Sequence, residues 1–389
     1  MQSSRPILPI IVFAQFCCTS LWFASNAIMQ DLVTTFALGT DAVSTLTSAV
    51  QFGFISGTLV FAIFTLTDRF SPSRVFFVCA LLGALSNLGL LWSGNTVVSL
   101  MICRYLTGFF LAGIYPVGMK IAADYFNTGL GTSLGYLVGA LVLGTAFPHV
   151  LNTFNASLSW ENVVTSTSGL AVLGGSLLWI LVPNGPFRKR SQQLQLGAFF
   201  QVFKNEKFRT AAFGYFGHMW ELYTFWAFTP LLLSSFSTTH QVPFSIPFWS
   251  FLIIGIGGVA CVIGGYMSRT YGEKKTARTA LLLSGACCLL LPLIFMAGHP
   301  MLFLVFMVFW GMVVIADSPL FSTLVAKNAT PELKGTALTI VNCIGFAITI
   351  VSIQCLGMLQ QNSGSVWVFS MLALGPLFGL YHLFAKSSN

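Results

Sequence analysis

Several ionisable side chains occur within long apolar stretches of this sequence, where a charged group is costly to hold. They include Arg104, His218, Glu221 and Asp317. In an apolar setting such residues usually pair with one another, line an aqueous cavity or carry a function. His218 and Glu221 are three positions apart and would share one face of a helix. Because histidine ordinarily titrates near neutral pH, this pair suits a site that binds and releases protons.

The same residues allow other interpretations. The His-x-x-Glu spacing can begin a metal site, although no second pair of ligands lies nearby in the sequence. Arg104 lies in the outer third of its apolar stretch, where a long side chain can extend to the surface. Asp317 comes just before Ser318 and Pro319, and proline frees a backbone carbonyl. The acid can therefore bind a cation, pair with Arg104 or hold a gate closed.

The elements that must position these residues are membrane-spanning helices. The chain has 389 residues, of which 56% are hydrophobic and 7% charged, and its mean hydropathy is +0.83. These values exclude an ordinary soluble protein, and apolar windows of about 20 residues recur along the whole chain. We therefore predict an all-α polytopic membrane protein with twelve transmembrane helices. Their predicted ranges are 6–30, 42–66, 74–94, 98–124, 128–152, 163–183, 209–235, 247–268, 277–297, 301–326, 336–359 and 365–385.

The loops between these stretches alternate in charge. All Lys and Arg residues except Arg104 fall on one side, and the loops of the other side carry acids such as Asp31 and Glu161. Basic loops are typical of the cytoplasmic side. Both termini are thus predicted to be cytoplasmic, in a multi-pass protein of the cell membrane, and a bacterial inner membrane is expected.

The longest polar segment divides the chain into two similar halves. We predict six-helix bundles over 1–183 and 209–389, joined by a cytoplasmic linker over 184–208 that forms either an amphipathic helix or a solvated connection. Gly108 and Pro116 recur 203 positions later as Gly311 and Pro319. Such internal repeats are typical of transporters, in which two bundles enclose a site near the membrane midplane.

This organisation resembles the major facilitator superfamily of secondary transporters, and the resemblance covers essentially the whole chain. The family's loop pattern G-x-x-x-D-R-x-G-R-R/K is matched at Asp68, Arg69 and Arg74, without its two glycines. A second copy after the eighth helix keeps Arg269 but has serine in place of the acid. Arg104 and the glycine four residues later match the family's R-x-x-x-G pattern, which implies a role in the transport cycle or in proton coupling.

Two subgroups of the family are matched only in part. The strings YPVGMKIAADYF and GHMWELYTFWAF are similar to a bacterial subgroup grouped with nitrate, nitrite and cyanate carriers. Nitrate carriers have an arginine in the middle of helices 2 and 8, whereas Arg69 and Arg269 lie in loops here. The fifth helix is rich in glycine but lacks the Gly-Pro pair of drug/proton antiporters.

Two sets of residues follow from the sequence and the resemblance. The gating set is expected to make contacts at the inner gate that form in one state and break in the other. The binding set is expected to line the cavity or to couple protons. The gating set is Asp68, Arg69, Arg74, Lys120, Asp124 and Arg269. The binding set is Arg104, His218, Glu221, Asp317, Trp22, Asn26, Tyr115 and Trp226.

We therefore expect a secondary active transporter and not an enzyme. It would move a small polar organic solute, cationic or zwitterionic, by alternating access, as a proton-coupled symporter. The nucleotide-binding pattern GxxxxGK[ST] has no match, so we expect neither ATP-driven transport nor a cofactor or metal. We expect a monomer that contacts its solute, protons and membrane lipids but no nucleic acid. An anion carrier of the nitrate or cyanate type, a drug/proton antiporter and an intramembrane metalloenzyme remain alternatives.

Overall fold

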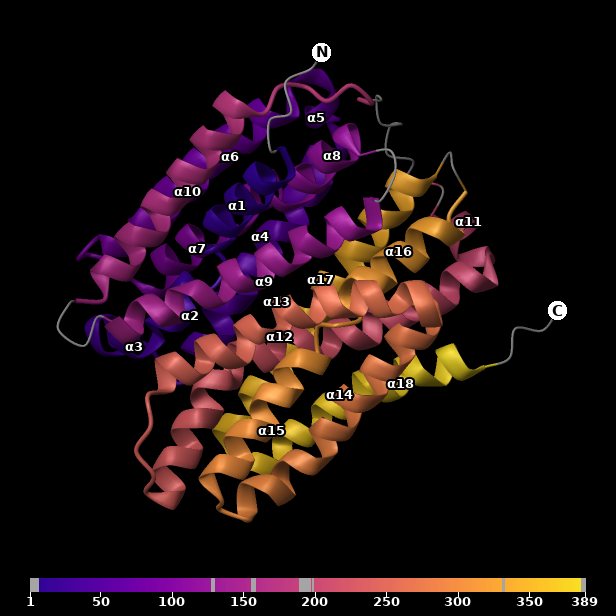
Figure 1. Cartoon of the computed structure of the whole chain (residues 1–389). Coiled ribbons are helices and arrows are strands. Elements are labelled where there is room, and N and C mark those ends of the chain that lie inside the picture. Colours follow the sequence, from indigo (N-terminus) through magenta and orange to yellow (C-terminus); the bar gives the residue numbers. More distant parts are fainter. Residues whose placement is uncertain are drawn as a thin grey trace.

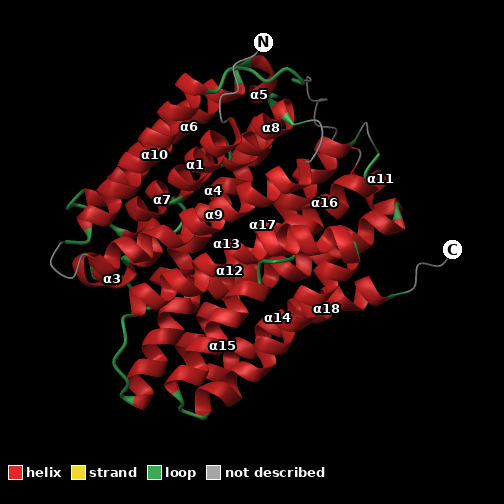
Figure 2. Ribbon diagram, viewed as in Figure 1, coloured by secondary structure: helices red, strands yellow, loops and turns green. Residues whose placement is uncertain are grey.

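The computed structural model is a bundle of helices packed side by side (Figure 1 and Figure 2). It describes residues 7–126, 130–154, 159–188, 197, 199–330 and 333–385, and no strand occurs among them. Helices α5, α8, α11 and α16 lie at the same end of the bundle, and α3 lies at the other (Figure 1). We call the end with α5 and α8 the basic end, because it carries Lys120, Arg188 and Lys327.

The first half contains ten α-helices and one 3-10 helix, η1. They are α1 (Ile7–Thr19), α2 (Ala24–Ala27), α3 (Met29–Phe36), α4 (Ala42–Ile63), α5 (Leu66–Arg69), α6 (Pro72–Leu88), η1 (Gly89–Leu91), α7 (Val97–Leu111), α8 (Tyr115–Tyr125), α9 (Leu130–Phe154) and α10 (Glu161–Leu181). The second half follows the linker. Its elements are α11 (Phe199–Lys204), α12 (Glu206–His240), α13 (Ile246–Tyr271), α14 (Glu273–Met296), α15 (Pro300–Val313), α16 (Ser318–Asn328), α17 (Lys334–Ser363), η3 (Val366–Ala373) and α18 (Leu374–Phe384).

Among the described residues, ten helical segments are long and apolar enough to cross a membrane when two helices separated by a short break are counted as one segment. The chain is therefore a multi-pass membrane protein. The predicted spans 6–30 and 209–235 are not among these ten. α1 is only 13 residues long because the chain leaves the helix after Thr19. α12 has 35 residues and is about 52 Å long, but polar side chains such as His218 and Glu221 lower its hydropathy.

Two predicted spans are each divided into two helices. The range 98–124 is broken between α7 and α8, and 301–326 is broken between α15 and α16. Each break is followed by a proline in the first turn of the next helix, Pro116 or Pro319. Proline has no N–H and favours the first turn of a helix, so it starts a new helix more readily than it continues one. These prolines occupy equivalent positions of the repeat.

The equivalent glycines have the same packing in both halves. A Cβ at Gly108 would lie 1.9 Å from the carbonyl oxygen of Val50 in α4, and one at Gly311 would lie 1.9 Å from that of Ile253 in α13. Only a residue without a side chain allows helix backbones to approach so closely. The repeat seen in the sequence therefore corresponds to a repeated helix contact.

Among the described residues, two helix pairs make the most extensive contacts between the halves. α9 packs along α13, and α17 packs along α4. Gly139 and Gly258 face one another across the first of these contacts, because a Cβ on either would come within 3.1 Å of the other's carbonyl oxygen. In the predicted linker, α11 is a helix of six residues. The predicted amphipathic helix includes this segment, and its part within 189–196 and 198 lies outside the described residues.

Candidate functional site

The guanidinium of Arg104 is completely buried in the first half. It donates hydrogen bonds to the carbonyl oxygens of Leu21 (3.1 Å) and Trp22 and to Oδ1 of Asn87 (3.3 Å). Leu21 and Trp22 belong to the segment between α1 and α2, where carbonyl groups outside a helix need other hydrogen-bond donors. The expectation that Arg104 reaches the surface or pairs with an acid of the second half is therefore wrong. Its charge-assisted hydrogen bonds stabilise the break in helix 1.

His218 and Asp317 meet at the break in helix 10. Nδ1 of His218 on α12 lies 2.8 Å from Oδ1 of Asp317, and both side chains are 1% exposed. Asp317 is the N-cap residue of α16, where the partial positive charge of the helix N-terminus favours a carboxylate. The pair thus links an unbroken helix to a broken one.

Glu221 lies on the same helix as His218 but has different partners. Its carboxylate accepts hydrogen bonds from Nε1 of Trp310 (2.6 Å), Oγ of Ser284 (2.9 Å) and Sγ of Cys288 (3.3 Å). These donors come from α14 and α15, so the carboxylate lies among helices of the second half. Sequence reasoning missed all three, because they are 63 to 89 positions away and nothing nearby marks them.

A small central cavity lies between the halves. Its open volume is about 40 Å³, which leaves no room for an organic solute in this conformation. Tyr115, in the first turn of α8, lines it, and Ile315 and Ser318 on either side of Asp317 do so as well. The other lining residues are Phe54, Met119, Leu141, Tyr215, Met219, Leu222, Tyr223, Asn342 and Phe346.

Aromatic rings close this cavity on the side away from the basic end. Trp22 lies 4.8 Å from Phe54 and 5.8 Å from both Tyr223 and Phe346, measured between ring centroids. The rings of Phe54 and Phe346 are 4.4 Å apart. Because Trp22 and Phe54 belong to the first half and Tyr223 and Phe346 to the second, the cluster brings the halves together.

A polar contact also joins the two halves, further from the basic end than the aromatic rings. Nε2 of Gln354 in α17 donates to Oγ of Ser48 (2.8 Å) and to the carbonyl oxygen of Ser44 (3.1 Å) in α4. These positions lie beyond the aromatic rings in both helices. The end of the molecule opposite the basic end is therefore closed in this conformation.

Two further members of the binding set are buried beside the aromatic rings. Nδ2 of Asn26 donates to Oγ1 of Thr47 (2.8 Å) within the first half. Trp226 is fully buried, and its ring centroid lies 5.3 Å from that of Tyr223. Neither residue is among those that line the central cavity.

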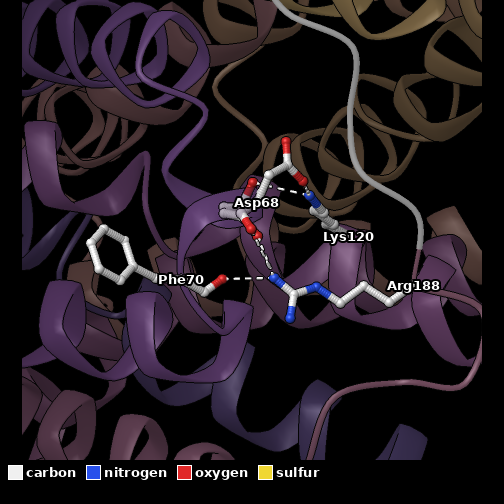
Figure 3. A network of polar contacts seen from close by, with 5 residues as sticks. Asp68, Phe70, Lys120 and Arg188 are labelled. Atoms are coloured by element: carbon white, nitrogen blue, oxygen red, sulfur yellow. Dashed lines mark hydrogen bonds and ion pairs between the residues drawn. The ribbon is translucent and has the colours of Figure 1, made fainter.

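Part of the gating set forms one network at the basic end (Figure 3). The ammonium of Lys120 on α8 pairs with the carboxylate of Asp68 on α5 and also donates to Oγ1 of Thr67 (3.2 Å). Arg188, which the sequence analysis did not single out, donates to the carbonyl oxygens of Thr67 (3.3 Å), Asp68 (3.3 Å) and Phe70 (2.9 Å). The start of the linker is thereby attached to the turn between α4 and α6.

The other gating residues are distributed around this network. Arg69 borders the same surface cavity as Asp68, and Arg74 is exposed in the first turn of α6. Asp124 is buried in the last turn of α8, and its carbonyl oxygen accepts from the N–H of Phe187 (3.0 Å). Arg269 lies in the second half, with its guanidinium 5.1 Å from the ring centroid of Tyr266.

The second half has an ion pair in the equivalent place, which the sequence analysis also missed. Lys327, near the end of α16, pairs with Glu273 at the start of α14. Lys120 lies about one turn earlier on α8, since the offset of 203 places Thr323 opposite it, and its partner Asp68 lies in the corresponding loop. The acid of the second copy is five residues downstream of the serine at position 268, and a lysine in the second part of each broken helix is the signal that could have located it.

The described part of the chain contains no group of three or more His, Cys, Asp or Glu side chains arranged to hold a metal ion. The nine cysteines are free. His218 and Glu221, which could begin a metal site by their spacing, make their contacts with different helices.

Comparisons with known proteins agree with this architecture. The family model described as Major Facilitator Superfamily matches residues 11–353. The nucleoside transporter NupG, solved as a mutant, has a TM-score of 0.71 at 17% identity, with 98% of each chain covered. The proton:xylose symporter XylE bound to 6-bromo-6-deoxy-D-glucose has a TM-score of 0.68 at 16% identity, with 96% of this chain and 94% of XylE covered. No curated protein matches the sequence. The chain belongs to the Major Facilitator Superfamily and is a transporter, not an enzyme.

Proposed function

We propose that the protein moves a small polar organic solute, cationic or zwitterionic, by proton-coupled alternating access. The observation that carries this proposal is the central cavity between the halves, with tyrosine, asparagine and serine in its wall and the His218–Asp317 pair at its border. Among the described residues, no Lys or Arg lines this cavity. A carboxylate without a nearby fixed cation attracts a cationic group of the solute or a proton.

The proposed topology has twelve spans with both termini in the cytoplasm, in two bundles over 1–183 and 209–389. Helices α1 to α3 and helix α12 would supply the first and seventh spans beside the ten apolar ones. The arrangement of the charged ends supports this topology, since α5, α8, α11 and α16 lie at one end (Figure 1).

Proton coupling is assigned to the pair of His218 and Asp317. Both groups can change charge, and they join two helices whose relative position must change when the cavity opens on the other side. Protonating Asp317 weakens its attraction to His218, which would release α16 from α12. The gain or loss of one proton can thereby alter a contact between two helices.

An anion carrier of the nitrate or cyanate type fits less well. Such a carrier needs a positive group at its cavity, but Arg104 donates to the carbonyls of Leu21 and Trp22. The solved relatives at 16% and 17% identity support the fold and leave the solute open. A polar organic solute with a positive charge agrees best with the charges around the cavity.

The test uses purified full-length protein in liposomes. Uptake of choline, glycine betaine, acetate and nitrate is measured with and without a pH gradient, and empty liposomes serve as the control. We expect uptake of choline or glycine betaine that increases with the gradient. Uptake of acetate or nitrate alone would overturn the assignment of solute class. An absence of any gradient effect would overturn proton coupling.

A further inference from the structure

Gln15 of α1 lies against the first turns of α8 and is completely buried. A Cβ on Gly118 would come 2.3 Å from Oε1 of Gln15, so the amide rests directly on the helix backbone. Gly118 is followed by Met119 and lies three residues after Tyr115, both of which line the central cavity. Gln15 therefore meets α8 next to the part of that helix that faces the cavity.

The amide group of Gln15 has no hydrogen-bond partner for either its oxygen or its nitrogen. A buried polar group without a partner costs about 1–3 kcal/mol, and a leucine of similar size would avoid that cost. The buried amide of Gln51 is half satisfied, since its Oε1 accepts from Nε1 of Trp22 (3.3 Å) while its Nε2 has no partner. An unsatisfied side chain in such a place is explained if another molecule or another conformation supplies its partners.

The N-terminus of α8 supplies further donors at this point. Its N-cap residue is Ile114, whose side chain cannot accept a hydrogen bond, and the first turn contains no acid. The first N–H groups of a helix have no acceptor within it and carry a partial positive charge. Tyr115 and Val117 contribute such N–H groups, whereas Pro116 has none. This helix end is therefore suited to a negatively charged oxygen.

The second half has an ion pair in the equivalent place, although both oxygens of Asp317 and Nε2 of His218 lack a hydrogen-bond partner. His218 of α12 reaches the start of α16 and meets the carboxylate of Asp317 there. The repeat offset of 203 positions places Ile114 opposite Asp317, so the first half lacks the acid. One side of the cavity thus carries a carboxylate, and the other carries a helix N-terminus with an unsatisfied amide.

We propose that Gln15 and the N-terminus of α8 form a subsite for the carboxylate of a zwitterionic solute. The amide of Gln15 and the N–H of Tyr115 donate to the carboxylate, and the cationic group of the solute faces Asp317. This inference rests on the proposed function and narrows its solute class from a cation or zwitterion to a zwitterion. Opposite charges at the two ends of the solute then match opposite charges on the two halves.

The test compares two solutes that share a trimethylammonium group. Glycine betaine carries a carboxylate and choline a hydroxyl, so the ratio of their dissociation constants reports on the carboxylate subsite. Binding to the full-length protein in detergent is measured by calorimetry. We expect the wild type to bind glycine betaine at least about tenfold more tightly than choline, and Gln15→Leu to abolish this preference. A tenfold change corresponds to about 1.4 kcal/mol, within the range of one hydrogen bond to a charged group.

Thermal unfolding separates binding from a structural role. Because the amide of Gln15 has no partner, we expect Gln15→Leu without solute to unfold at the same temperature as the wild type or higher. The matched variant Gln51→Leu leaves the indole of Trp22 unpaired and should unfold at a lower temperature. A lowered unfolding temperature for Gln15→Leu, with the preference for glycine betaine retained, would show a structural role and overturn the inference.

A second variant tests the subsite without changing Gln15. Gly118→Ala places a methyl group where the amide oxygen now lies, so it should displace the amide and reduce the preference for glycine betaine. The control Gly265→Ala has open space around its Cβ and should leave the preference unchanged. Choline bound as tightly as glycine betaine by the wild type would overturn the subsite and leave the proposed transport of a cation intact. Binding of neither solute would count against both.

Discussion

Nδ1 of His218 lies 2.8 Å from Oδ1 of Asp317, and the contact connects the continuous helix α12 to the point where helix 10 breaks. Both side chains are almost completely buried, so bulk water does not screen the interaction between them. A change in the proton content of this pair therefore changes the force between two helices that border the cavity.

Replacing Asp317 with asparagine keeps the size of the side chain but removes its charge. We expect Asp317→Asn to abolish the stimulation of uptake by a pH gradient while solute exchange at equal pH on both sides continues. The measurement is uptake and counterflow of the transported solute in liposomes. Gradient-driven uptake at the rate of the wild type would contradict the role of Asp317.

Glu221→Gln is the matched comparison on the same helix. The carboxylate of Glu221 accepts from Trp310, Ser284 and Cys288, and the new amide group would face one or more of these donors. We expect the free energy of unfolding to fall by about 1.5–3 kcal/mol, with gradient dependence retained. Thermal unfolding and liposome uptake measure the two effects. Loss of gradient dependence at unchanged stability would instead place proton coupling at Glu221.

Arg104 is expected to act on the stability of the break in helix 1. Arg104→Met leaves the carbonyls of Leu21 and Trp22 unpaired, which costs about 1–3 kcal/mol for each. Arg104→Lys keeps the positive charge but lacks the several N–H donors of the planar guanidinium, so its unfolding temperature should lie between those of the wild type and Arg104→Met. Thermal unfolding is the measurement, and the exposed Arg69→Met is the control. Equal unfolding temperatures for the wild type and Arg104→Met would contradict this role.

The two equivalent glycines should be equally intolerant of a side chain. Gly108→Ala and Gly311→Ala each place a methyl group against a backbone carbonyl of a neighbouring helix, and a backbone cannot rotate away as a side chain can. We expect each to lower the free energy of unfolding by about 1–3 kcal/mol. Gly169→Ala, whose Cβ would meet open space, is the control for both. Unchanged unfolding of either variant would argue against the repeated contact.

The Asp68–Lys120 pair should contribute more than its counterpart in the second half. The exposed fractions of its side chains are 9% and 16%, against 27% and 59% for Glu273 and Lys327. Exposed pairs are worth little because water screens them. A double-mutant cycle with Asp68→Asn and Lys120→Met should give a coupling energy of about 0.5–3 kcal/mol. The same cycle at Glu273 and Lys327 should give less, and the reverse order would contradict the prediction.

Helix positions and the repeat could be predicted from the sequence because they depend on local pattern. The apolar runs located ten spans, and the spacing of Pro116 and Pro319 located equivalent helices. The break after Thr19 could not be predicted in this way. No proline or glycine marks it, and its carbonyls are stabilised by Arg104, which lies more than 80 positions away.

In the candidate site, too, the sequence indicated some residues, whereas others could be identified only from tertiary contacts. The composition of the buried stretches identified His218, Glu221 and Asp317 as candidates, but the spacing of His218 and Glu221 did not indicate that their direct partners lie on different helices. Partners such as Trp310 and Asn87 are ordinary residues in sequence terms and gain a role only through tertiary packing. The amide of Gln15 was likewise overlooked, since an unsatisfied group can be recognised only when its surroundings are known.

The helix breaks are unevenly divided between the halves. Helices 1 and 4 of the first half are interrupted, as is helix 10 of the second, whereas α12 runs uninterrupted for 35 residues. An intact helix transmits a displacement from one end to the other as a stiff rod, and an interrupted one can bend between its parts. Among the described residues, the first half therefore has two interrupted spanning helices, and the second half has one beside α12, a long continuous helix that contains Pro230. Despite their similar construction, the two bundles are mechanically unequal partners.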